Sequence, residues 1–180
     1  MTRFRPISAV GLAALTLAAC APTLGPPPPG RPGPRPSGPA EFNPADFGWA
    51  AAPGPNGIVG RGSLRQGQTA YTCAGAGVVL TPETPWSRRR MAALYGSTER
   101  AALPADEVRK RTPSAPPGDA GPYVKRTTCD QQDRFSFSGL PNGAWYVITI
   151  ARPAGQPQGE TLALMKRVTT RGGRVTQVAF

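Results

Sequence analysis

The chain holds three cysteines and no histidine, and these two facts limit the chemistry open to it. Without histidine, the sequence excludes a Ser-His-Asp triad, a Cys-His dyad and a zinc site built on imidazole ligands. The cysteines are Cys20, Cys73 and Cys129. From its residue type alone Cys20 has three uses: a disulfide bond, a place in a membrane-spanning helix, or the attachment of another group.

Carboxylates are the acid–base groups that remain. Two suitably spaced carboxyl groups suffice for glycoside hydrolysis, whereas a calcium ion needs roughly six to eight oxygen ligands. Nothing in the sequence brings any pair of acids together over a groove. We therefore expect no catalytic residue, no metal site and no cofactor, and interpret the acids as turn, cap and surface residues. The acids considered are Glu83, Asp106, Glu107, Asp130 and Asp133.

Residues 1–19 have the layout of a secretory signal peptide. Arg3 and Arg5 precede an uncharged apolar run, as such signals require. The run is shorter than the ~20 residues of a membrane-spanning helix. The letters LAAC, which end at Cys20, resemble the lipobox of bacterial lipoproteins. The resemblance implies cleavage immediately before Cys20 and a lipid attached to its sulfur, so that membrane lipid is the first expected partner.

The lipobox also implies a location. In Gram-negative lipoproteins an aspartate after the cysteine often directs retention in the inner membrane, and here that position holds Ala21. We therefore expect an anchor in the outer membrane, with the protein facing the periplasm. In this oxidising compartment Cys73 and Cys129 remain as one pair. We expect a disulfide bond between them, and two buried free thiols are the alternative.

Basic residues outnumber acidic ones, 21 to 10, which gives a formal net charge of +11. Two basic clusters flank a long connection between expected strands. Together they fit an anionic partner, such as an acidic glycan or lipopolysaccharide, or another envelope protein. We do not expect nucleic acid, and scattered solvated charges are the alternative. The clusters comprise Arg88, Arg89, Arg90, Arg109, Lys110 and Arg111.

After the signal peptide, residues 20–55 are dominated by proline and glycine. Such a segment cannot bury enough apolar surface to order itself. We therefore expect a disordered, semi-rigid linker that carries the lipid at its start. Phe42, Phe47 and Trp49 mark the approach to the folded part.

From residue 56 onward, short segments with the composition of strands alternate with turn residues. In residues 134–139 the alternation is regular and places Phe135 and Phe137 on the core face. The pattern lapses over residues 86–122, where WSRRRMAALYG and PADEVRKR favour short helices. Three roles are open for that stretch: a lid, an interaction loop or an inert insertion. The expected strands are 57–65, 76–82, 123–129, 134–139, 144–152, 161–170 and 174–180.

Three segments resemble a carboxypeptidase regulatory-like domain: AGVVLTPETPW, TTCDQQDRFSFSGLPNGAWYVITI and RVTTRGGRVTQVAF. The shared features are Leu-x-Pro at a strand end, a Phe-x-Phe strand, Leu-Pro-x-Gly, an aromatic-led strand and a final glycine turn. The match covers residues 57–180. Asp133 stands where the family usually has glycine, and aspartate also tolerates left-handed turns. The resemblance implies a transthyretin-like β-sandwich. In that family the regulatory domain accompanies a zinc carboxypeptidase domain and does not contain the active site.

The sequence thus predicts an all-β fold, a single antiparallel β-sandwich of about seven strands over residues 56–180. With its anchor and linker, the chain is expected to be a non-catalytic binding or scaffolding module of the cell envelope. Two other functions stay open. One is a structural spacer without a specific ligand, and the other is a hydrolase that uses surface carboxylates.

Overall fold

The structure is a computed structural model that describes residues 41–156 and 158–180. The expected signal peptide, Cys20 and the first half of the expected linker lie outside the described residues. Within the described residues the chain forms ten strands, two α-helices and three 3-10 helices. None of these helices is long and apolar enough to cross a membrane.

The strands are β1 (Asn56–Arg61), β2 (Leu64–Gln66), β3 (Thr69–Thr72), β4 (Gly77–Pro82), β5 (Arg100–Pro104), β6 (Lys125–Thr128), β7 (Arg134–Leu140), β8 (Gly143–Pro153), β9 (Leu162–Thr170) and β10 (Val175–Ala179). The helices are α1 (Pro85–Tyr95) and α2 (Ala105–Arg111), with 3-10 helices η1 (Pro44–Ala51), η2 (Thr112–Ser114) and η3 (Gly121–Tyr123).

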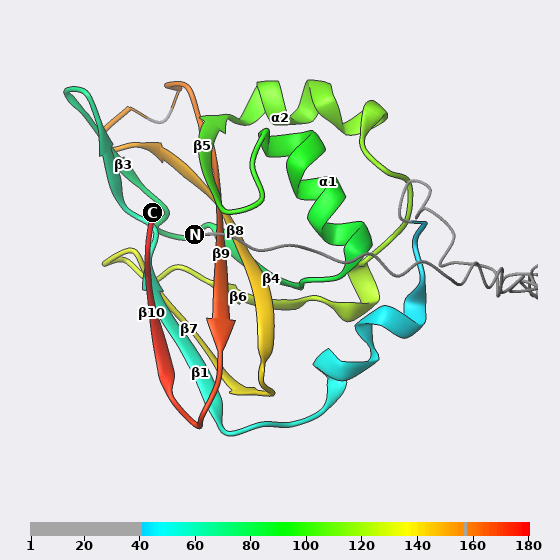
Figure 1. Cartoon of the computed structure of the whole chain (residues 1–180). Helices are drawn as coiled ribbons and strands as arrows, with labels where there is room; N and C mark the ends of the chain where they lie inside the picture. The colour runs from blue at the N-terminus through cyan, green and yellow to red at the C-terminus, as the bar shows by residue number, and fades with distance from the viewer. Residues whose placement is uncertain (1–40, 157) are drawn as a thin grey trace, which may run out of the picture. The chain divides into compact units, whose positions relative to one another are not determined.

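Two sheets form a sandwich-like arrangement, which confirms the predicted fold class (Figure 1). The smaller sheet has three strands in the order β10-β1-β7. The larger has seven, with β8 at its centre, β9 and β5 on one side, and β4-β6 and β3-β2 on the other. All pairs are antiparallel except β1 with β10. A parallel pair needs a long connection between its strands. Here β1 and β10 are the first and last strands of the described residues, so all the other described strands belong to that connection.

Strand alternation decides which side chains fill the space between the sheets. In β8, Trp145 and Val147 point inward and are fully buried, whereas Tyr146 and Ile148 point to the outer face. The indole Nε1 of Trp145 donates a hydrogen bond to Thr170 Oγ1 at 3.0 Å, so the buried donor is satisfied. The predicted core residues Phe135 and Phe137 join the same cluster.

Helix α1 begins at a capping box. The N–H of Ser87 donates to the Thr84 hydroxyl at 3.0 Å, and the N–H of Thr84 donates to the Ser87 hydroxyl at 2.7 Å. These bonds satisfy backbone donors that a helix start leaves unpaired. The helix ends at Gly96, which has a φ of 67°. Both helices predicted within residues 86–122 are present, and the apolar side of α1 packs on the outer face of the larger sheet.

Cys73 and Cys129 form a disulfide bond, which confirms the pairing predicted from the sequence. Their bond joins the loop after β3 to the loop after β6, and both residues are buried. Asp133 holds the same region together from the turn before β7. Its φ is 63°, so aspartate does occupy the left-handed position expected of glycine. Its Oδ1 accepts hydrogen bonds from the N–H groups of Cys73 and Ala74 at 2.8 and 3.0 Å.

The segment expected to form one strand over residues 57–65 is two strands. Gly62 lies in the break between them, where a Cβ would lie 2.5 Å from Cys73 Sγ, so the chain passes directly against the disulfide there. Strands β3 and β5 are additional to the predicted set. Strand β5 belongs to the insertion at 86–122 and extends the larger sheet by pairing with β9.

Residues before the predicted boundary at residue 56 also pack on the domain. Helix η1 belongs to the segment expected to be linker, yet Phe47 and Ala50 are buried. Trp49 packs edge-on against Trp145, with the ring centroids 4.8 Å apart. The aromatic residues in this segment provide the apolar area that the preceding proline-rich residues lack, which is why this part of the expected linker packs on the domain.

Candidate functional site

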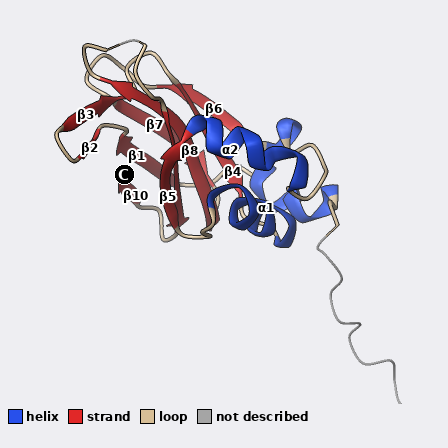
Figure 2. Cartoon of the chain, turned by 90° about the horizontal axis from the view of Figure 1, so that it is seen from above, coloured by secondary structure: helices blue, strands red, loops and turns tan. Residues whose placement is uncertain are grey.

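The outer faces of the two sheets differ in what covers them. Met91 and Tyr95 of α1 pack against Tyr146 and Met165 on the outer face of the larger sheet. On the outer face of the three-stranded sheet, Val59 and Val175 are 38% and 61% exposed. Figure 2 shows α1 and α2 gathered on the side away from β10 and β1. Within the described residues, the smaller sheet is therefore the one whose outer face is open.

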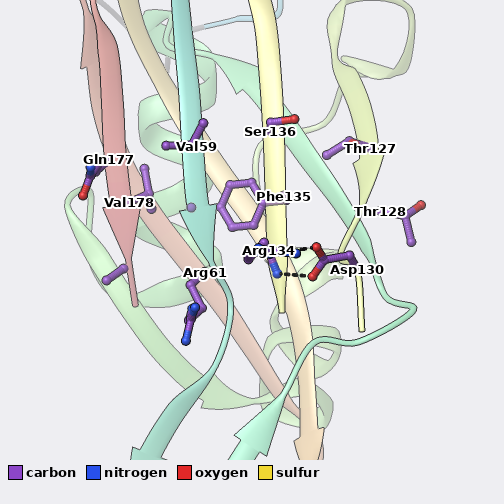
Figure 3. A pocket seen from close by; sticks show the side chains of 12 residues that line it. Val59, Arg61, Thr127, Thr128, Asp130, Arg134, Phe135, Ser136, Gln177 and Val178 are labelled. Carbon is purple, nitrogen blue, oxygen red and sulfur yellow. Dashed lines mark hydrogen bonds and ion pairs between the residues drawn. The ribbon is translucent and has the colours of Figure 1, made fainter. Parts of the chain in front are cut away.

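The register of the three-stranded sheet brings polar side chains together on this open face. Val59 pairs with Ser136 on β7 and with Gln177 on β10, and Arg61 pairs with Arg134. All five side chains are exposed, and they alternate with buried or half-buried neighbours along each strand. They line a cleft of about 780 Å³, which we call the β1–β7 cleft (Figure 3).

The cleft continues past the edge of β7 to Thr127 and Thr128 on β6. Strands β6 and β7 follow each other in the chain but belong to different sheets. The sandwich is therefore open along this side, and hydroxyl groups of both strands border the opening. Hydroxyl, amide and guanidinium groups around a small apolar patch can bind a polar ligand by hydrogen bonds.

The two arginines of the cleft differ in their surroundings. Arg134 Nε donates to Asp130 Oδ2 at 2.9 Å, which fixes its guanidinium (Figure 3). The backbone N–H of Arg134, its side chain and the N–H of Gln132 lower the pKa of Asp130 below its ordinary value. Arg61 is exposed and has no ion-pair or hydrogen-bond partner within the part of the chain that the structure describes. Arg61 is therefore the cation in this cleft that is open to an anionic group.

Aromatic side chains do not provide a stacking surface in the cleft. Among the described residues, the one aromatic residue that lines it is Phe135, which is 4% exposed. Trp86 and Trp145 are also buried, at 2% and 0% exposed. A ligand of this cleft would thus be held by charge and hydrogen bonds, which favours an acidic molecule over a neutral one.

The basic clusters predicted from the sequence lie on α1 and α2, away from this cleft. All five arginines have partners within the described residues, Arg89 included. Arg88 pairs with Glu83 at 2.8 Å and Arg111 donates to the carbonyl of Leu94 at 3.1 Å. The remaining contacts are Arg90 with the carbonyl of Pro116, Arg109 with Asp106, and Arg111 with Glu107. Lys110 is exposed.

Glu83 is enclosed by its partners, and its side chain is 13% exposed. Arg167 Nη2 lies 2.6 Å from one carboxylate oxygen, and the Tyr146 hydroxyl donates to the other at 3.3 Å. Burial alone would raise the pKa of Glu83, but the hydrogen bonds and charges of Arg167 and Arg88 outweigh it and hold the pKa below its ordinary value. Burial, and then the charge of Glu83, raise the pKa of Tyr146. This network joins β8, β9 and α1 to the connection that follows β4.

The sequence holds a local signal for the cleft residues. Regular alternation in RFSFSG already placed Arg134 and Ser136 outward, and GIVGRG places Val59 and Arg61 outward in the same way. What the sequence did not give is that β1 lies between β7 and β10, which brings those positions together. No group of three or more candidate metal ligands of the His, Cys, Asp or Glu type occurs among the described residues.

Comparisons with known proteins support the fold. No family model matches the chain, and no curated protein matches it. The crystal structure of a candidate carbohydrate-binding protein from Pseudomonas aeruginosa is similar, with a TM-score of 0.53 and 23% identity. The similarity covers 76% of this chain and 94% of that one. At this level of identity the likeness shows the fold, which is the β-sandwich described above.

Proposed function

We propose that this protein is a non-catalytic binding module of the cell envelope, held by a lipid on Cys20, and that its β1–β7 cleft binds an acidic glycan. The observation that carries the proposal is Arg61, an unpaired cation on an open polar sheet face beside an arginine already fixed by Asp130. The fold is shared with a candidate carbohydrate-binding protein, which supports a glycan as the ligand class. The same fold fits the carboxypeptidase regulatory-like group, to which we assign residues 57–180.

The chemistry of an acidic sugar matches the cleft in two ways. A carboxylate or sulfate can accept parallel hydrogen bonds from a guanidinium, and such charge-assisted pairs are stronger than neutral ones. The ring hydroxyls can donate to and accept from Ser136 and Gln177. An exposed site of this kind gives modest affinity that falls as salt screens the charges.

Replacing Arg61 with Gln is expected to weaken the binding of tetragalacturonate about tenfold, because one charge-assisted pair is lost. Isothermal titration calorimetry on the full chain carrying Cys20→Ser measures the affinity without a lipid. Arg65→Gln is the matched control, since Arg65 is an exposed arginine on β2 outside the cleft. An equal loss of affinity in both variants would contradict the proposal and indicate non-specific electrostatic attraction. Equal binding of neutral galactotetraose would also contradict it. No binding of either sugar would favour the spacer.

The lipid anchor is tested separately. Cys20→Ser is expected to abolish labelling by an alkyne-tagged fatty acid and to move the protein from the detergent phase to the aqueous phase on Triton X-114 partition. The physical reason is that two or more acyl chains are needed for stable membrane attachment, at about 0.8 kcal/mol for each buried methylene. Ala21→Ser serves as the control and should partition like the native chain. A Cys20→Ser chain that stays in the detergent phase would refute the anchor.

A further inference from the structure

A second cavity lies under the insertion, on the opposite side of the larger sheet from the core. Its volume is about 300 Å³, which reaches the lower end of the range for small-molecule sites. Val79 and Ile148, both half-buried, form its floor on the outer face of the sheet. Met91 and Leu94 of α1 line one wall, and residues 118–121 form part of the rim. We call this cavity the α1 pocket.

The loop that borders the α1 pocket is held in place by named contacts. Trp86 Nε1 donates to the carbonyl of Pro117 at 2.7 Å, and Arg90 Nη1 donates to the carbonyl of Pro116 at 2.6 Å. Gly118 has a φ of 133°, and a Cβ there would lie 2.7 Å from Phe42. Because these contacts fix the loop against α1 and the N-terminal segment, the pocket is formed before any ligand arrives.

The charges around the pocket favour an anion. Two arginines and one aspartate line it: Arg90, Arg126 and Asp119. The carboxylate of Asp119 already accepts from the N–H of Gly121 at 2.7 Å. Arg126 is exposed, and its hydrogen bond to the Gly121 carbonyl is 3.4 Å long, which is weak. Its guanidinium can therefore turn to an incoming anion at little cost.

We propose that the α1 pocket binds a small molecule with an apolar body and one anionic group. The apolar body would rest on Val79 and Ile148 between Met91 and Leu94, and the anionic group would pair with Arg126. This proposal does not depend on the glycan site, because no residue lines both the α1 pocket and the β1–β7 cleft, although both reach β6. It also gives the insertion at 86–122 a function: its first helix and its last loop supply much of the pocket wall.

The probe for this pocket is 1-anilinonaphthalene-8-sulfonate, an apolar dye with one sulfonate, and N-phenyl-1-naphthylamine is its uncharged counterpart. Fluorescence titration of the full chain carrying Cys20→Ser is expected to show one saturable site for the sulfonate. Arg126→Gln should weaken that site about tenfold and leave the binding of the uncharged dye unchanged. Val79→Gln places a polar group on the floor and should weaken the binding of both dyes.

The control variant is Arg152→Gln, an exposed arginine of β8 that does not line the pocket. Circular dichroism melts show whether each variant remains folded, and Arg126 is exposed enough for its replacement to be tolerated. Equal affinity of the sulfonate dye for the native chain and Arg126→Gln would overturn the proposal, as would an equal loss in Arg152→Gln. Tetragalacturonate binding should be unchanged in Arg126→Gln, so a failure here is distinct from a failure of the glycan site.

Discussion

Replacing both Cys73 and Cys129 with serine is expected to lower the free energy of unfolding by about 4 kcal/mol. The two residues are 56 positions apart, so the bond restricts a long loop in the unfolded chain and removes much of its conformational entropy. Urea unfolding followed by tryptophan fluorescence measures the change. This loss is a large part of the roughly 5–15 kcal/mol that stabilises an ordinary domain.

The native chain in the presence of a reductant is the control for this prediction. It should lose a similar amount of stability, because reduction removes the same restriction without changing the packing of other residues. Asp133 would still hold the loop after β3 through its bonds to Cys73 and Ala74, so we expect the reduced domain to remain folded. A change below about 1 kcal/mol in both experiments would show that the bond does not stabilise this fold.

Replacing Glu83 with glutamine is expected to lower the free energy of unfolding by about 2 kcal/mol at pH 7, since hydrogen bonds to a charged group are lost. Arg167 and Arg88 would then face a neutral amide. The half-exposed side chain of Arg88 keeps the loss moderate, because solvent screens its charge. Chemical unfolding of the native chain and of the variant over a range of pH measures the difference.

The pH dependence of that difference has a defined direction. The pKa of Glu83 is lowered in the folded protein, so its carboxylate stabilises the fold fully above the ordinary glutamate pKa. This contribution disappears as the pH falls through the lowered pKa. The gap between the native chain and Glu83→Gln should therefore be widest near neutral pH and close in acid. Glu99→Gln, a replacement of an exposed acid, is the control. A gap that widens in acid would contradict this account.

The sequence predicted the parts of the fold that depend on local patterns. Regular alternation around Phe135 and Phe137 located β7 and its core face, and the paired cysteines were assigned correctly. The helices of the insertion were visible because α1 begins at a proline-containing cap and α2 carries acids first and bases last. Apart from the cysteine pairing, which joins positions 56 apart, these signals are encoded within a few residues of one another.

Other features that depend on distant partners were not predicted. Strand β5 is half-buried along most of its length and contains a proline, so it forms a strand because β9 offers an edge to pair with. Helix η1 packs on the domain because Phe47 is buried there and Trp49 contacts Trp145, a residue distant in the sequence. The β1–β7 cleft likewise exists because β1 lies between β7 and β10, and the register across three strands cannot be read from any one of them.

The most direct test of the account is to map where an acidic glycan binds. Amide signals of the full chain carrying Cys20→Ser would be followed by ¹H–¹⁵N NMR during a titration with tetragalacturonate. We predict that the largest shifts fall on β1, β7 and β10 around Arg61, Ser136 and Gln177. Shifts concentrated on α1, α2 and the connection between them, or no shifts at high sugar concentration, would contradict the assignment of the β1–β7 cleft as the binding site.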